Sequence, residues 1–177
     1  MATDFDWAGF RALAKRLDDL VAGERNDERD DEQFAEDLRR AITFVYTAGV
    51  TMPSAGDVYE DAGGDEFWNG TEVPGLAPGK DVADDLTAAE TLAARIAESV
   101  EAAQPDALGD PEEIADVATS AAENLLDAVA RISAGSELFD AKRLREAQWE
   151  WSFGFDDWGS NAIAALAALH ELLWGAR

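Results

Sequence analysis

Residues 110–135, DPEEIADVATSAAENLLDAVARISAG, hold the clearest helix signal in the chain. Asp110 is a preferred N-cap residue, and Pro111 has the fixed φ that suits the first helical position. Two glutamates follow in the first turn, where the helix dipole favours negative charge. Apolar residues then recur at three- and four-residue steps, the period of a helix with one buried face. This stripe is Ile114, Val117, Ala121, Leu125, Ala128 and Ile132. The stretch predicts a long amphipathic helix, which we expect Gly135 to end.

The helical period extends outward on both sides of this stretch. Toward the C-terminus it predicts helices over about 138–153 and 160–174, and the second is apolar almost all round. Such a helix is typically buried, so we expect residues 160–174 to form the central helix. Toward the N-terminus the pattern predicts helices over about 4–22, 34–49 and 86–103.

Capping and loop signals separate these segments. The pairs with the spacing of a capping box, which marks a helix start, are Thr3 with Asp6 and Thr87 with Glu90. Residues 53–80 are rich in Gly and Pro and predict a long loop, with a short helix near Asp57 to Asp61. Loops of this length inside a compact domain tend to be functional or disordered. Its aromatic residues favour a cover that packs on the core.

No stretch shows the sustained two-residue alternation of a strand, and there is no internal repeat. We therefore expect a single all-α domain over residues 1–177, a bundle of about six helices packed mostly antiparallel. A chain of 177 residues can bury about two-thirds of its unfolded surface in one core. No apolar run has the length of a membrane span and no signal peptide is present, so we expect a cytoplasmic protein that does not bind membranes.

The chain is strongly acidic, with 38 Asp and Glu against 14 Lys and Arg and a formal net charge of -24. We expect no nucleic-acid partner, because such binding depends on Lys and Arg replacing counterions along the phosphate backbone. An acidic surface can attract basic partners or divalent cations. We interpret most of this acidic surface as solvated charge that maintains solubility. The absence of cysteine and the single histidine exclude thiolate chemistry, disulfides and sites built from several histidines.

Several short elements occur in a distinctive order. In the N-terminal half they are Phe10, Phe34, Tyr46 and Met52-Pro53. In the C-terminal third they are Glu113 to Val117, Gly135, Asp140-Ala141, Phe153, Trp158-Gly159 and Ala165 to His170. This set resembles a bacterial family known as domain of unknown function number five thousand and sixty-three, whose members end in a Phe, a Trp-Gly pair and an Ala-Leu-x-Ala-Leu-His helix. The resemblance implies a compact all-helical cytoplasmic protein and brings with it no catalytic residue or cofactor.

A dense run of aromatic residues begins at Trp149. Trp149 and Trp151 are about 200° apart on a helix, so they cannot both face the core. We favour core packing for most of these rings, with their indole N–H groups hydrogen bonded. At least one ring should reach a second surface, where it can stack on a planar ligand or anchor a partner. The candidate binding residues are Trp68, Trp149, Trp151, Trp158 and His170.

His170 lies one turn after Leu166 and one turn before Trp174 on a crowded helix face. An imidazole there can act as a general base if an acid such as Asp156 or Asp157 lies nearby. We favour a buried, hydrogen-bonded histidine near the aromatic cluster.

Four carboxylates suggest an enzymatic alternative. Glu113 and Asp116 share one face of their helix, and Glu98 and Glu101 on the preceding helix can complete a Mg²⁺ site for a nucleotide phosphate. The spacing resembles the Glu-x-x-Asp of all-helical MazG-type nucleotide pyrophosphohydrolases. Those enzymes also carry Glu-Glu-x-x-Glu on the preceding helix, and this chain lacks one of those acids. We favour a dipole interaction for Glu113 and a solvated Asp116.

Taken together, these patterns favour a binding or protein-interaction module that is not an enzyme. Its expected surface is the 53–80 loop over the aromatic run, and its partner is an unknown protein or a second copy of the chain. No cofactor is expected. The alternative is a Mg²⁺-dependent nucleotide pyrophosphohydrolase, and Mg²⁺ belongs to that alternative alone.

Overall fold

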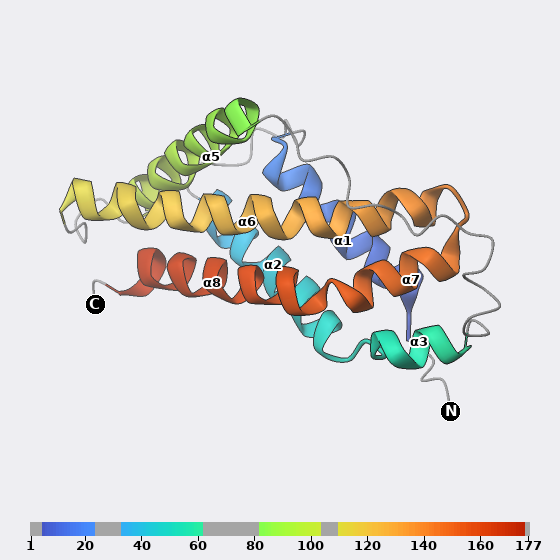
Figure 1. Cartoon of the computed structure of the whole chain (residues 1–177). Helices are drawn as coiled ribbons and strands as arrows, with labels where there is room; N and C mark the ends of the chain where they lie inside the picture. Colours follow the sequence, from blue (N-terminus) through green and yellow to red (C-terminus); the bar gives the residue numbers. More distant parts are fainter. Residues whose placement is uncertain (1–4, 24–32, 62–81, 104–109, 176–177) are drawn as a thin grey trace.

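The computed structural model describes residues 5–23, 33–61, 82–103 and 110–175, apart from the side chains of 82–85. Every regular element among these residues is an α-helix, which confirms the predicted all-α class (Figure 1). The helices are α1 (Trp7–Val21), α2 (Phe34–Val50), α3 (Ala55–Asp61), α5 (Val82–Ala103), α6 (Pro111–Asp140), α7 (Leu144–Phe153) and α8 (Phe155–Trp174). The short helix expected near Asp57 to Asp61 is therefore confirmed as α3.

A long antiparallel hairpin of α6 against α7 and α8 organises the bundle (Figure 1). α6 begins as predicted, because the Asp110 carboxylate accepts a hydrogen bond from the Glu112 backbone N–H at 3.1 Å and Pro111 follows the cap. The chain reverses after α6 in a tight turn in which Lys142 has a φ of 66°. α7 and α8 then return along α6, joined by Gly154, whose backbone keeps a helical conformation.

Gly135 lies inside α6, so the prediction that it ends this helix is wrong. It is a site of close packing instead. A Cβ at Gly135 would lie 2.5 Å from Cδ1 of Trp151 and 2.8 Å from its Cε2. The indole therefore packs against bare α6 backbone, and its N–H donates to the Ile132 carbonyl at 2.8 Å. The glycine in this sequence provides space for a ring rather than a helix stop.

Three predicted helix starts are also corrected. α5 begins at Val82 rather than near 86, and Thr87 lies within the helix, where its carbonyl accepts a hydrogen bond from a hydroxyl one turn later. α7 begins at Leu144 rather than near 138, because the intervening residues complete α6 and the turn. α8 begins at Phe155 rather than near 160, because Gly154 does not interrupt the helical backbone. Capping and glycine signals are local, and the continuing helices override them.

α1 begins with a local cap. The Asp6 carboxylate accepts a hydrogen bond from the Gly9 backbone N–H at 2.8 Å, so the helix starts at Trp7 rather than near residue 4. Thr3, the other member of the expected capping box, lies outside the described residues.

α2 is capped from another helix. Gln33 precedes α2 and makes no side-chain capping bond. The Ala35 backbone N–H donates instead to Oγ of Ser99 on α5 at 3.0 Å, and Ser99 is buried. Because the first N–H groups of a helix have no partner within the helix, this contact joins the start of α2 to α5.

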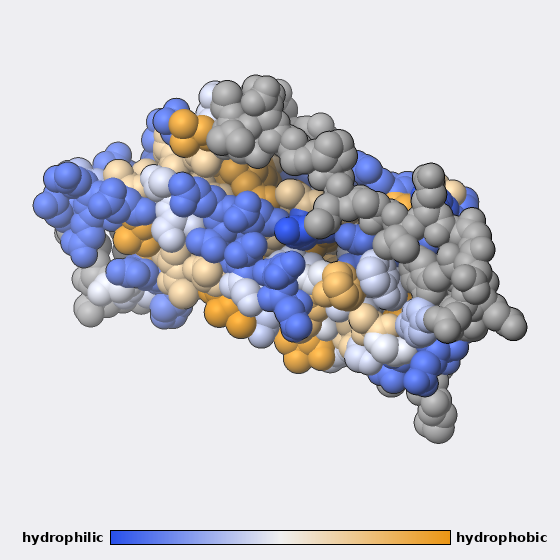
Figure 2. Space-filling model, in the orientation of Figure 1, coloured by the Kyte–Doolittle hydropathy of each residue, from blue (hydrophilic) through white to orange (hydrophobic). Residues whose placement is uncertain are grey.

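α6 lies at the centre of the bundle and packs against α1, α5, α7 and α8. α8 packs on α6 and α2 but leaves an outer side exposed, on which Ile163 is 49% exposed. The expectation that residues 160–174 form the central buried helix is therefore corrected, because α6 holds that position. The apolar residues of α8 pack on two sides, against α6 and against α2. Hydrophilic residues follow the outer side of α6, and apolar residues gather along the edge formed by α8 (Figure 2). No helix of the described part has the length and hydropathy needed to cross a membrane.

Candidate functional site

Trp151 and Trp158 belong to the core. Their exposed fractions are 0% and 1%. The Trp158 indole N–H donates to the Trp151 carbonyl at 3.0 Å, and the Trp151 indole bonds to α6 as described above. The Phe10 ring meets the Trp151 ring edge-on at 5.0 Å, and the Trp7 ring stacks on it at 6.1 Å. The interpretation of these two tryptophans as binding residues does not fit this placement, because neither indole has a face or an N–H open to a partner.

Trp149 and Phe153 form the exposed part of the aromatic run. They lie one turn apart on the side of α7 opposite Trp151, with ring centroids 4.6 Å apart and ring planes 9° from parallel. Phe153 is 64% exposed, and Trp149 is half-buried. The helix geometry thus separates the run into core rings and surface rings, as the spacing of Trp149 and Trp151 predicted. We call Trp149 and Phe153 the α7 aromatic pair.

Trp68 lies in the range 62–81, all of which is outside the described residues. The described beginning of the 53–80 segment includes α3, which packs against α7 (Figure 1). The expectation that the rest of the segment covers the aromatic run remains a prediction.

His170 is exposed, so the prediction of a buried histidine near the aromatic cluster is wrong. Its ring lies 5.0 Å from the ring of Trp174, one turn later on α8. The Arg39 guanidinium from α2 lies over the same indole at 4.8 Å and is paired with Glu36 at 2.7 Å. The aspartates expected beside His170 lie in the first turn of α8, roughly 20 Å away along the helix axis. The neighbour of the histidine ring is therefore the Trp174 indole, and the two aspartates expected beside it are not its neighbours.

The four carboxylates of the enzymatic alternative are exposed. Glu98 and Glu101 lie on α5, whereas Glu113 and Asp116 lie on the first turns of α6. Within the described ranges, no three Asp, Glu or His side chains come together in a group that can hold a metal ion. The convergence that a Mg²⁺ site requires is thus missing from this part of the chain. Glu113 lies in the first turn of α6, where a favourable dipole interaction was expected.

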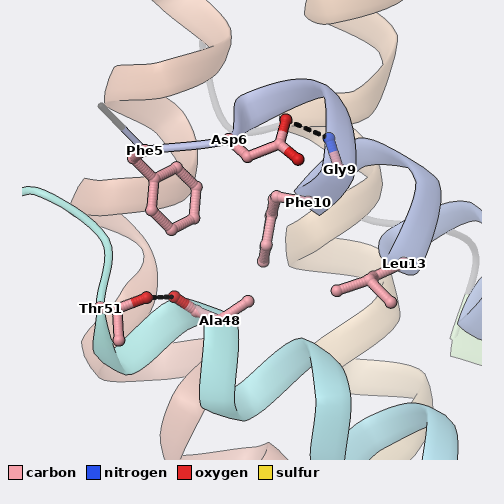
Figure 3. Close-up of a pocket in the computed structure, with 7 residues that line it drawn as sticks. All are labelled: Phe5, Asp6, Gly9, Phe10, Leu13, Ala48 and Thr51. Atoms are coloured by element: carbon pink, nitrogen blue, oxygen red, sulfur yellow. Dashed lines mark hydrogen bonds between the residues drawn. The ribbon is translucent and has the colours of Figure 1, made fainter. Parts of the chain in front are cut away.

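An apolar cavity of about 590 Å³ opens between the start of α1 and the end of α2 (Figure 3). It is lined by Phe5, Asp6, Gly9, Phe10, Leu13, Ala48 and Thr51. Both polar side chains in this set make capping bonds: the Asp6 carboxylate accepts from the Gly9 N–H, and the Thr51 hydroxyl donates to the Ala48 carbonyl at 2.9 Å. Small-molecule sites combine an apolar lining with polar groups that orient the ligand. The cavity supplies the lining without such groups.

A polar cavity of about 380 Å³ lies between α6 and the first turns of α8. Its charged side chains are Asp127, Arg131, Asp156 and Asp157. Half-buried Glu150 on α7 interacts electrostatically with Arg131, and burial raises the pKa of its carboxyl despite that positive charge. Sequence reasoning missed both Arg131 and Glu150. No spacing in the chain relates them, because they are neighbours only across the hairpin.

The span from residue 20 to residue 174 matches one family model. The search of curated proteins found no match, and neither did the search of solved structures. The matching model is described as a domain of unknown function (DUF5063), and its span includes every helix from α2 to α8. It is the family that the ordered elements from Phe10 to His170 resemble. Because the match covers most of an all-helical chain, the protein belongs to the DUF5063 family.

Proposed function

We propose that the protein is a protein-interaction module, not an enzyme, and that it binds its partner through the α7 aromatic pair. The observation that carries this proposal is the exposure of Phe153, which is 64% exposed while its ring stacks on Trp149. The Phe153 ring presents apolar area to water on the surface of α7, and it stacks on the half-buried ring of Trp149. Burying such rings is a main source of interface free energy, and aromatic residues are enriched among the dominant contacts of interfaces.

The pair is held rigidly, which favours recognition. Ala147 and Trp151 anchor the opposite side of α7 in the core, and both are fully buried. An ion pair between Arg143 and Glu146 at 3.2 Å lies at the start of the helix. A preorganised surface loses little conformational entropy when a partner binds, so more of the contact free energy appears as affinity.

The charge of the chain indicates the chemistry of the partner. The net charge is -24; Glu150 lies between the two residues of the pair, Asp156 and Asp157 follow them, and Glu146, which precedes them, is paired with Arg143. A field of this sign draws cationic segments and repels acidic ones. We therefore expect the partner to contribute an apolar anchor for the ring pair, flanked by Lys or Arg.

A peptide-display selection against the folded protein tests this proposal. The selected peptides should carry Trp, Phe or Leu next to Lys or Arg. One of them is then titrated calorimetrically into the natural chain, Trp149→Ala, Phe153→Ala and the control Phe44→Ala. Phe44 is 54% exposed and lies on α2, away from α7.

The first two variants should bind at least tenfold more weakly, a loss of about 1.4 kcal/mol, and the control should bind like the natural chain. Binding should also weaken as salt is added, because a basic partner is attracted partly by long-range charge. Peptides without basic residues, or an affinity unchanged in both α7 variants, would refute the proposal. Circular dichroism of each variant checks that the helices are retained.

A further inference from the structure

We infer that the outer side of α2 and α8 is a self-association surface, on which two copies of this chain pair antiparallel. This α2–α8 face consists of the half-buried and exposed residues Thr43, Tyr46, Thr47 and Val50 on α2, and Ile163, Ala167 and His170 on α8. It includes neither ring of the α7 aromatic pair, and the test at Ile163 does not depend on the proposed function.

Close packing at two glycines brings the helices together at this face. A Cβ at Gly49 would lie 2.6 Å from Cε2 of Phe155, and a Cβ at Gly159 would lie 3.0 Å from the same atom. The Phe155 ring is therefore held between α2 and α8, and Tyr46 stacks on it at 6.0 Å. One turn beyond Tyr46 is Val50, and one turn beyond Gly159 is Ile163. The helical period thus places these two side chains on the same outer side.

The face exposes two large apolar side chains among small and uncharged ones. Val50 is 57% exposed and Ile163 is 49% exposed. The apolar edge along α8 is visible below the hydrophilic side of α6 (Figure 2). Exposed apolar residues that gather on one side of a molecule commonly mark a site of association.

Carboxylates are missing from both stretches that build the face. The chain has 38 Asp and Glu, yet none lies between Asp37 and Asp57 or between Asp157 and Glu171. The two stretches are distant in sequence, but α2 packs on α8 and joins them into one surface. On a chain with a net charge of -24, a second copy meets little like charge here. A basic partner would find no carboxylate to pair with, so the occupant that fits is another copy.

The two ends of the face carry opposite charge, which sets the orientation. At one end, Arg39 and Arg40 share the single carboxylate of Glu36 at 2.7 and 2.8 Å, so these three side chains together carry one positive charge. At the other end, near the start of α8, Asp156 is exposed. A twofold axis that lies in the plane of the interface, at right angles to α2 and α8, brings the positive end of one copy to the negative end of the other. In the antiparallel pair the apolar centres of the two faces meet, and each end of one face meets the end of opposite charge on the other.

Single-cysteine variants test the face directly, since the natural chain has no cysteine. Ile163→Cys lies near the middle of the face and should give a covalent dimer with a short bismaleimide reagent. The matched control is Leu86→Cys, which has a similar exposure of 59% but lies on α5, outside the α2–α8 face. It should stay mostly monomeric under the same conditions.

Sedimentation equilibrium gives the second test. The natural chain should show a monomer–dimer equilibrium that shifts toward the dimer as salt screens the repulsion between two chains of charge -24. Ile163→Asp should raise the dissociation constant at least tenfold, and Leu86→Asp on α5 should change it less than twofold. Asp156→Lys should weaken the dimer, and Arg40→Glu added to it should restore association.

Some outcomes overturn the inference. A chain that stays monomeric up to millimolar concentration at high salt has no such surface. A dimer that Ile163→Asp leaves intact uses another face. Failure of the Arg40→Glu change to restore the Asp156→Lys variant contradicts the antiparallel orientation. Failure of the proposed peptide binding at α7 would leave the Ile163→Asp result unaffected, because Ile163 takes no part in the proposed function. Asp156 belongs to both arguments, so the Asp156→Lys variant does not separate them.

Discussion

Replacing Gly135 by alanine should destabilise the protein, although it places the best helix former inside the 30-residue α6. In an isolated helix the change would stabilise by about 1 kcal/mol. In the fold, the new methyl carbon would lie 2.5 Å from Cδ1 of Trp151 and 2.8 Å from Cε2. A good contact between carbon atoms needs about 3.5–4.0 Å. The methyl group and the indole ring therefore cannot both keep their places.

The ring of Trp151 has no room to move away. Its neighbours are the rings of Phe10 at 5.0 Å, Phe139 at 5.7 Å and Trp7 at 6.1 Å. Overpacking a core of this kind costs about 1–3 kcal/mol. A shift of the ring also breaks its bond to the Ile132 carbonyl and leaves a buried N–H unpaired, which costs about 1–3 kcal/mol. After the gain in helix propensity is subtracted, we expect a net loss of about 3 kcal/mol, which lowers Tm by roughly 6–12 °C.

Urea and thermal unfolding followed by circular dichroism measure this loss. The matched control is Gly56→Ala in α3, where a Cβ would meet only Ser54 Oγ, at 3.7 Å. The control should be neutral or stabilising by up to about 1 kcal/mol. In a Trp151→Phe background the Gly135→Ala change should cost less, because the smaller ring leaves room. A Gly135→Ala variant as stable as Gly56→Ala, or a cost unchanged in that background, would refute the packing argument.

Four further predictions follow from buried and charged groups. Ser99→Ala removes the acceptor for the buried Ala35 N–H and should cost about 1–3 kcal/mol in urea unfolding; an unchanged midpoint contradicts the cap. Burial raises the pKa of Glu150, so its charge opposes folding at neutral pH, and Glu150→Gln should stabilise there but not in acid. The Arg39 hydrogen bond lowers the pKa of Glu36, so Glu36→Gln should destabilise the protein at neutral pH, and this difference should be lost as pH falls through the range in which carboxyl groups titrate. Stability is measured against pH for both variants. The two assignments are refuted if Glu150→Gln does not stabilise and Glu36→Gln does not destabilise the protein at neutral pH. Finally, added salt should raise Tm by screening a net charge of -24, and a Tm that falls would contradict self-repulsion.

The surface inferences depend on the division of the aromatic residues between core and solvent. Trp151 and Trp158 are buried with their indole N–H groups bonded, and this firm anchoring holds Trp149 and Phe153 in a fixed position outside. The same packing that stabilises the bundle thus presents a stacked pair at the surface. A partner would meet rings that are already ordered, which is why the α7 variants are expected to affect affinity more than stability.

Local signals were predictable from the sequence because their physics is local. Asp110 and Pro111 determine the start of α6 through one capping bond and one fixed dihedral angle. The all-helical class follows from the three- and four-residue apolar period, and the angle between Trp149 and Trp151 predicts that one ring is displaced from the core. One part of the candidate site was therefore predictable, because the sequence indicated that an aromatic ring lies at the surface of this helix. The sequence did not show that Phe153 is the most exposed of these rings.

Only the tertiary structure decided what each of these residues does. Glycine commonly follows the last residue of a helix, so Gly135 suggested a helix end. Its actual role, which is to leave space for the Trp151 ring against α6, appears only in the tertiary structure. His170 lies on an apolar helix, and its exposure appears only when α6 and α2 have taken the other sides of α8. The two stretches without carboxylates become one face for the same reason. The sequence by itself determines that helices form and roughly where, because helix formation depends on neighbours within a turn. Where several of them begin or end, and which side of each faces water, depends on contacts between residues far apart in sequence.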